Sequence, residues 1–185
     1  MSIFLWLLAV IIVRFVYFPL NARTPRLFWN LPIDEKIPLI PAFIVPYMLY
    51  VPYEIFAVVF LWSNQTLLTN YLQSYLVTNI LALIFWYFFP NGVARLKLTG
   101  QDFLTRSVSF VHQHDGSCNG FPSGHVFGAV TTTYFLILST GNYLWLIPGI
   151  LISISTVFVK QHYLVDIPGG ITWSFLGIWL VNLIK

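Results

Sequence analysis

The chain has 185 residues, of which 58% are hydrophobic and only 8% are charged. Soluble domains carry roughly 25% charged residues, so nine Lys and Arg with six Asp and Glu cannot cover a water-facing surface. The net charge of +3 is small and scattered, which favours anionic lipid or phosphate over nucleic acid as a partner. The composition therefore predicts an integral membrane protein.

Six apolar runs approach the length of about 20 residues that crosses a bilayer. The first run lacks a basic segment before it and a small-residue cleavage site after it, so we interpret it as a retained anchor. Four prolines in or before the second run, Pro38, Pro41, Pro46 and Pro52, predict a kinked entry. The predicted spans are Ile3 to Leu20, Ile40 to Trp62, Leu72 to Pro90, Gly124 to Leu138, Tyr143 to Val159, and Tyr163 to Ile184. The predicted fold is one all-α bundle, a polytopic membrane-embedded domain over residues 1–185.

An even number of spans places both chain ends on one face of the membrane. The opposite face then receives three connectors, Asn21 to Pro38, Asn91 to Ser123, and the junction Lys160 to His162, which carry most of the polar residues. Lys185 belongs to the face of the chain ends. Seven of the nine cations fall on the connector face: Arg23, Arg26, Lys36, Arg95, Lys97, Arg106 and Lys160.

The segment Phe121 to His125, Phe-Pro-Ser-Gly-His, stands at the mouth of the fourth span. Ser123 suits the N-cap of the helix that follows, and the free amides of a helix N-terminus bind anions well. His125 falls in the first turn, beside any anion held there. The same residues also suit a plain helix start with a histidine at the membrane interface.

A second polar segment runs from Ser155 to Asp166. His162 and Asp166 are four residues apart, so on a helix they would share one face, and the carboxylate would accept a proton from one imidazole nitrogen. The other nitrogen would then be free to act as a nucleophile. A carboxylate in an apolar segment indicates function by default, although a structural His-Asp pair explains the same spacing.

Two histidines, one backed by a carboxylate and one beside an anion site, supply a nucleophile and a general acid for phosphoryl transfer. These residues resemble the type 2 phosphatidic acid phosphatase superfamily of lipid phosphate phosphatases and phosphotransferases. Pro122 to His125 match its Pro-Ser-Gly-His motif, and Ser155, His162 and Asp166 match its third motif at the family spacing. The resemblance runs from about Ile33 to Gly170.

The chain departs from the superfamily pattern at three positions. Thr156 stands where the third motif has arginine, and Phe88 and Leu96 replace the lysine and proline of the first motif around Arg95. Lys160, one helical turn beyond Thr156, and Lys97 are candidates to supply the missing charge. A small branch related to inositol phosphorylceramide synthase-like proteins is similar in having Ser-Thr followed by Lys-Gln-His-Tyr.

The resemblance implies a metal-independent and cofactor-free hydrolysis of a lipid phosphate. In this mechanism His162 attacks phosphorus to form a phosphohistidine, Asp166 orients the imidazole, and His125 protonates the leaving group. The implied phosphate ligands are Arg95, Lys160, Lys97 and the backbone amides of Ser123 and Gly124. Two alternatives stay open: a phosphotransferase that uses an alcohol acceptor, and a catalytically silent lipid-binding or transport homologue.

Sidedness is predicted differently by two arguments. The positive-inside rule makes the connector face cytoplasmic, whereas membrane members of the superfamily present their site on the extracytoplasmic side. We follow the resemblance, which implies the plasma membrane with an external site, because Arg95, Lys160 and Lys97 are assigned to the ligand. Cys118, the single thiol, is predicted on the same face as the motifs, where a membrane-impermeant maleimide would test the sidedness.

The remaining polar groups give weaker signals. A short cluster, His112, His114 and Asp115, favours a solvated loop or a substrate rim over a metal site, since its spacing does not put two ligands on one helix face. Arg14 and Glu54 are the other intramembrane charges, for which a buried ion pair and snorkelling of the arginine are both open.

Overall fold

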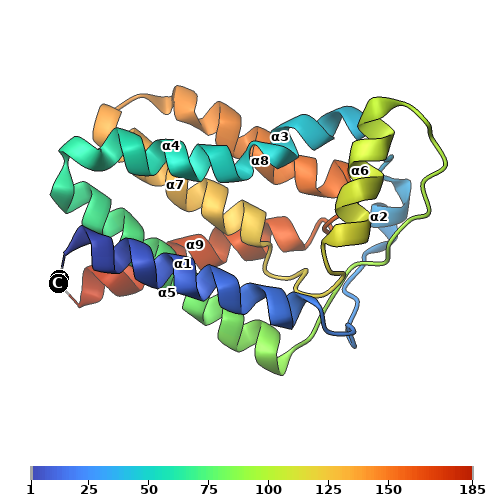
Figure 1. Ribbon diagram of the computed structural model, residues 1–185, viewed down its shortest axis with the longest axis horizontal. Helices are drawn as coiled ribbons and strands as arrows, with labels where there is room; N and C mark the ends of the chain where they lie inside the picture. Colours follow the sequence, from blue (N-terminus) through green and yellow to red (C-terminus); the bar gives the residue numbers. More distant parts are fainter. Residues whose placement is uncertain (1, 185) are drawn as a thin grey trace.

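The computed structural model describes residues 2–184 as an elongated bundle of helices (Figure 1). Within these residues the only strand-like pairings are two isolated bridges, between Leu27 and Asn91 and between Gly92 and Cys118. The all-α fold class is therefore confirmed. The helices are α1 (Ile3–Asn21), α2 (Pro32–Lys36), α3 (Ile44–Met48), α4 (Tyr50–Phe60), α5 (Gln65–Phe88), α6 (Phe103–His114), α7 (Gly124–Thr140), α8 (Leu146–Phe158) and α9 (Asp166–Leu183).

Three short 3-10 turns extend these helices. They are η1 (Pro41–Phe43) before α3, η2 (Leu61–Ser63) after α4 and η3 (Tyr143–Trp145) before α8. The second predicted span is thus a chain of short segments with a break at Leu49, as its prolines indicate. Elsewhere, polar caps set the helix starts: Asn64, Asp102 and Ser123 accept amide hydrogen bonds from the first turns of α5, α6 and α7.

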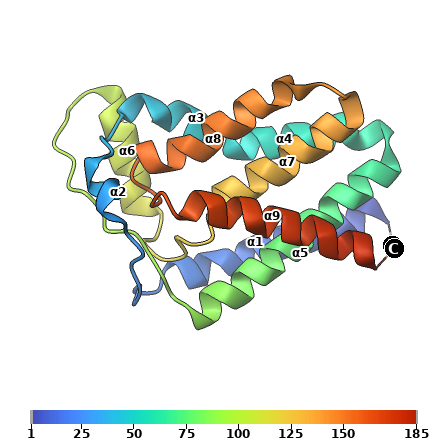
Figure 2. The ribbon, with the colours of Figure 1, turned by 180° about the vertical axis from the view of Figure 1, so that it is seen from behind.

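The long helices run side by side along the bundle. In it α5 packs against α1, α7 and α9, while α7 also packs against α4 and α8. The main core lies between these helices and includes Tyr71, Leu72, Ala129 and Ile152. Figures 1 and 2 show that α1 begins and α9 ends at the same end of the bundle, while α2 and α6 cover the other end. The polar connectors therefore gather at one end, as predicted.

Within residues 2–184, three segments are long and apolar enough to cross a membrane: Ile3–Asn21, Pro41–Ser63 and Gln65–Phe88. The segment Tyr143–Phe158 is apolar but shorter. These segments support a membrane association, while the count of six spans stays a prediction.

The connector Asn91 to Ser123 holds more structure than the sequence analysis assigned to it. It contains α6, a helix whose inner side buries Val108 against α3 and the end of α8. Cys118 in the same connector is 4% exposed, so its thiol is not the accessible label site that we predicted. Lys185 lies outside the described residues.

Candidate active site

His162 and Asp166 form a buried pair at the start of α9. His162 Nδ1 lies 3.1 Å from Asp166 Oδ2, and the two residues are 8% and 1% exposed. The contact between the two side chains is confirmed, but not on a shared helix face, since His162 lies in the loop before α9 and Asp166 is its first residue. The amide of Tyr163 donates to the same carboxylate oxygen at 3.0 Å, which fixes the carboxylate.

The loop that carries His162 is held by the end of α8. Lys160 has a left-handed backbone, with φ of 59°, so the chain leaves the helical path immediately after α8. The amides of Gln161 and His162 then both donate to the carbonyl of Thr156, at 2.9 and 3.1 Å. Lys160 therefore does not lie one helical turn beyond Thr156 on α8, and its role as the replacement for the family arginine stays a prediction.

His125 lies in the first turn of α7 and approaches His162. The two ring centroids are 5.9 Å apart. Two tyrosines flank His125, with Tyr47 stacked at 4.3 Å and Tyr50 tilted at 4.5 Å between ring centroids. The sequence analysis did not identify Tyr47 or Tyr50, because nothing in their spacing marks them among the 18% aromatic residues.

The turn before α7 connects the two motifs through the backbone. Ser123 Oγ accepts from the amide of Val126 at 3.4 Å, which confirms the N-cap. The amide of Ser123 donates to the carbonyl of Asp166 at 3.4 Å, so this amide is engaged within the protein. Of the two predicted amide ligands, Gly124 is the one whose N–H has no acceptor within residues 2–184.

A cavity of about 530 Å³ opens beside His162. His162, Lys160, Tyr163 and Asp34 line it together with residues of the 93–96 connector. Arg95 and Lys97 are not among the lining residues, whereas their neighbours Val93, Ala94 and Leu96 are. The structure therefore brings one of the three predicted cationic ligands into the cavity with the catalytic candidate.

Lys160 is tied to the segment that covers the loop. Its ammonium donates to the carbonyls of Asp34, at 2.9 Å, and Ile37, at 2.5 Å. A lysine ammonium has three N–H groups, so one donor stays free to bind an anion in the cavity. Burial lowers the pKa of Lys160 from its ordinary value of 10.5, and the charge of Asp34 opposes that shift.

Arg95 lies behind the cavity wall. Its guanidinium donates to Gln161 Oε1 at 2.5 Å and to the carbonyl of Gly116. Burial lowers its pKa, while the charge of Asp115 raises it. Lys97 is exposed and forms no hydrogen bond or ion pair with residues 2–184. Arg95 thus contacts the residue next to His162, and its role as a direct phosphate ligand stays a prediction.

Asp34 clamps α2 onto the loop. Its carboxylate accepts from the amides of Leu31 and Leu164, each at 2.7 Å, and the residue is buried. The sequence analysis included Asp34 only within the resemblance and gave it no role, since its partner Leu164 is 130 residues away.

Removal of the Asp34 carboxylate is expected to loosen this clamp. Asp34→Ala leaves the amides of Leu31 and Leu164 without their carboxylate acceptor, which costs about 2 kcal/mol of unfolding free energy. Thermal and denaturant unfolding in detergent would measure this change. Glu35→Ala, at the exposed neighbour, is the matched control. Equal stability of the two variants would contradict the clamp.

Arg14 and Glu54 meet inside the bundle through two tyrosines. Arg14 donates to the hydroxyls of Tyr50, at 2.6 Å, and Tyr75, at 3.0 Å, and Tyr75 donates to Glu54 at 2.6 Å. The guanidinium and the carboxylate are 3.9 Å apart. Of the two alternatives for Arg14, the ion pair is the one found.

This network reaches the site through Tyr50. Its hydroxyl donates to the carbonyl of Gly124 at 3.2 Å, and its ring packs on His125. Gly128 leaves the space for this contact, because a Cβ there would lie 2.4 Å from Glu54 Oε1 and 2.6 Å from the Tyr50 ring. The lack of a side chain at Gly128 therefore makes room for the hydrogen-bond network of Tyr50 and Glu54 as well as for close helix packing.

The polar cluster in the long connector has structural contacts. His112 Nε2 lies 2.8 Å from the carbonyl of Val159, and Asp115 accepts from Asn21 at 2.6 Å. His114 is exposed at the end of α6. Residues 2–184 contain no group of three His, Cys, Asp or Glu side chains placed to hold a metal ion.

Comparison of the chain with known protein families, with curated proteins and with solved structures gives no match.

Proposed function

We propose that the chain is an integral membrane lipid phosphate phosphatase, related to the type 2 phosphatidic acid phosphatase superfamily, that works through a phosphohistidine. The observation that carries the proposal is the buried His162–Asp166 pair, with the ring centroids of His125 and His162 5.9 Å apart. The cavity beside this pair and the apolar character of the chain support a lipid substrate.

His162 acts as the nucleophile through Nε2. Nδ1–H donates to Asp166, which leaves the lone pair of Nε2 free. Nε2 attacks phosphorus, the bond from phosphorus to the lipid oxygen breaks, and His125 gives its proton to that oxygen. Water then attacks the phosphohistidine, His125 accepts the proton of the water, and inorganic phosphate leaves.

The anionic oxygens of the phosphoryl group are held by two kinds of donor. Lys160 lines the cavity and has one N–H left for the phosphate, and the free amide of Gly124 adds the N-terminus of α7. Arg95 positions Gln161, the neighbour of His162. In this proposal, Lys160 and the N-terminus of α7 replace the positive charge of the family residues that are missing at Phe88 and Thr156.

Phosphate release from purified protein tests the proposal. The panel contains phosphatidate, phosphatidylglycerol phosphate, sphingoid phosphates and polyprenyl diphosphates in detergent, each with and without an alcohol acceptor. Release without acceptor and an acid-labile, base-stable phosphoprotein on rapid quenching are expected. Phosphorylation of the alcohol instead of release would identify a phosphotransferase, and no turnover on any substrate would favour the silent homologue.

The alkaline limb of the pH profile is expected to come from Lys160. Its pKa lies below 10.5 because burial disfavours the ammonium; the ammonium is charged below that pKa, and activity falls as pH rises through it. Lys160→Arg keeps the charge to higher pH, so its alkaline limb is expected to move upward. Initial rates between pH 7 and 11 check this, and identical limbs would contradict it.

We further propose six spans, with the site on the extracytoplasmic face of the plasma membrane. Both chain ends then lie in the cytoplasm. Because Cys118 is buried, the test uses an exposed position, Thr99→Cys, in a Cys118→Ala background. Labelling of intact cells by a membrane-impermeant maleimide is expected. Labelling only after lysis would place the site on the cytoplasmic face and contradict the proposed orientation.

A further inference from the structure

One buried tyrosine, Tyr47 of α3, has a hydroxyl group without a hydrogen-bond partner. Five tyrosines are buried within residues 2–184. The hydroxyls of four of them form hydrogen bonds inside the bundle, namely those of Tyr50, Tyr53, Tyr71 and Tyr75. Tyr47 is 4% exposed, and no residue from 2 to 184 donates to its hydroxyl or accepts from it. A buried phenol normally has such a partner, so this hydroxyl is available to a ligand.

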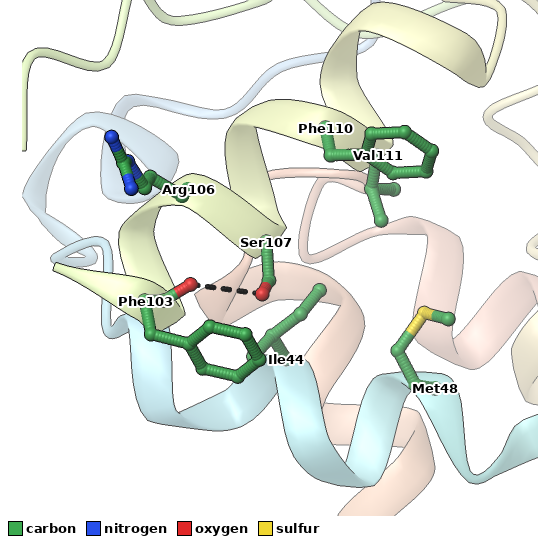
Figure 3. Close-up of a pocket in the computed structure, with 7 residues that line it drawn as sticks. All are labelled: Ile44, Met48, Phe103, Arg106, Ser107, Phe110 and Val111. Carbon is green, nitrogen blue, oxygen red and sulfur yellow. Dashed lines mark hydrogen bonds between the residues drawn. The ribbon is translucent and has the colours of Figure 1, made fainter. Parts of the chain in front are cut away.

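The ring of Tyr47 faces the interior of the bundle. Helix α3 packs against α8, and Tyr47 belongs to a buried cluster with Val159, three residues before His162. On the outer side of α3, Ile44 and Met48 border a groove next to α6 (Figure 3), and Tyr47 does not line this groove. The position of the phenol is therefore fixed relative to the loop that carries His162.

On the inner side, Tyr47 contacts His125. The two rings are stacked, with centroids 4.3 Å apart and an angle of 28° between their planes. The centroid of the His125 ring lies 5.9 Å from that of His162. Tyr50 also packs on His125, but its hydroxyl already donates to the carbonyl of Gly124. Of the two tyrosines on His125, Tyr47 is thus the one with a hydroxyl left for a ligand.

Two further unpartnered donors belong to neighbours of the same histidines. The amide of Gly124, next to His125, has no acceptor within residues 2–184. Arg95 holds Gln161, next to His162, and its Nε is buried without a partner. Three free donors are thus attached to residues that contact or adjoin the two histidines, and the oxygens of an anion accept hydrogen bonds from such a set.

Tyr47 and Arg95 lie within electrostatic reach of each other. Burial lowers the pKa of Arg95, whereas the charge of Asp115 and then the phenol of Tyr47 oppose that shift. The carboxylate of Asp115 is itself bound by Asn21, at 2.6 Å. The Tyr47 hydroxyl therefore has a cation in its surroundings as well as His125, which suits a group that binds an anion.

From these contacts we infer that Tyr47 is a further phosphate-binding residue of the proposed active site, with its hydroxyl donating to a non-bridging oxygen of the phosphoryl group. The inference rests on the proposed function and names a residue outside the superfamily's three motifs. A phenol O–H donates without bringing charge, and a hydrogen bond to an anionic oxygen is stronger than one between neutral groups. The hydroxyl thus holds the phosphoryl group against His125, which protonates the leaving oxygen.

Binding of orthovanadate to the purified full chain in detergent tests the inference without turnover, because orthovanadate has the tetrahedral oxygens of phosphate and no lipid chain. Tyr47→Phe keeps the ring on His125 and removes the hydroxyl. Its affinity for orthovanadate is expected to fall about 10- to 100-fold, the effect of one hydrogen bond to an anion, and phosphate release should fall by a similar factor. Its thermal unfolding midpoint should not fall, since the hydroxyl has no partner in the chain to lose. Equal orthovanadate affinity in the two proteins would overturn the inference.

The matched control is Tyr53→Phe, which removes a hydroxyl that bonds Thr133 and the carbonyl of Trp145. It is expected to lower the unfolding midpoint by about 2 to 4 °C and to keep the affinity for orthovanadate. The same pattern in Tyr47→Phe would mean that its hydroxyl has a structural partner, and would overturn the inference. Wild-type protein that neither binds orthovanadate nor hydrolyses any lipid would refute the proposed function together with the inference, whereas an active wild type with an unaffected Tyr47→Phe would refute the inference alone.

Discussion

His162→Ala is expected to lower phosphate release by about 10⁴- to 10⁶-fold, because it removes the atom that becomes bonded to phosphorus in the proposed mechanism. The phosphoprotein on rapid quenching should disappear with it. Substrate binding should change little, since the proposal assigns the phosphate to other groups. Rates over the lipid panel and equilibrium binding of the substrate measure both effects.

The control for this variant is His114→Ala, which removes an exposed histidine at the end of α6. It should keep its activity. Asp166→Asn is a further comparison, because it removes the charge next to the imidazole but keeps a side chain of the same size. It should lower the rate of phosphate release strongly and the affinity for the substrate little. Full activity in His162→Ala would refute the phosphohistidine mechanism.

Glu54→Leu is expected to destabilise the protein by about 3 kcal/mol. The change leaves the Arg14 guanidinium without its carboxylate and removes one acceptor of the Tyr75 hydroxyl, and an unpaired charge inside the bundle is unfavourable. Unfolding in detergent would measure the loss. The activity of the fraction that remains folded should also fall, because Tyr50 of the same network contacts His125.

A double variant separates charge from shape. Arg14→Met combined with Glu54→Leu removes both charges and should recover most of the stability, since an apolar pair of similar volume replaces an ion pair at little cost. Additive losses from the two single variants would show that Arg14 and Glu54 do not act as a pair.

Several features could be predicted from the sequence because each depends on neighbouring residues or on composition. Scarcity of charge predicted an apolar helical bundle. Most helix bounds lie within about three residues of the predicted spans, but α5 begins at Gln65, well before the predicted start at Leu72, because polar residues dilute its first two turns. Ser123 caps α7, and His162 with Asp166 forms a pair. The prediction that His162 contacts Asp166 is confirmed, but the geometry differs: His162 lies in the loop before α9, and the two residues do not share a helix face.

The cavity wall depends on the fold of a connector that has no periodic pattern. In the segment 93–97, Val93, Ala94 and Leu96 line the cavity while Arg95 and Lys97 do not. Sequence spacing does not give the direction of side chains in such a segment. Which cations line the cavity could therefore be decided only from the coordinates.

The sequence by itself determined the apolar character of this protein, the approximate positions of its apolar helices and the two polar segments with their histidines, because hydropathy and local spacing act over short distances. Only the tertiary structure decided that His125 meets His162, that Asp34 closes over Leu164 and that two tyrosines join Arg14 to Glu54. These contacts connect residues from 21 to 130 positions apart. Helix packing in the bundle sets them, and no local pattern encodes that packing.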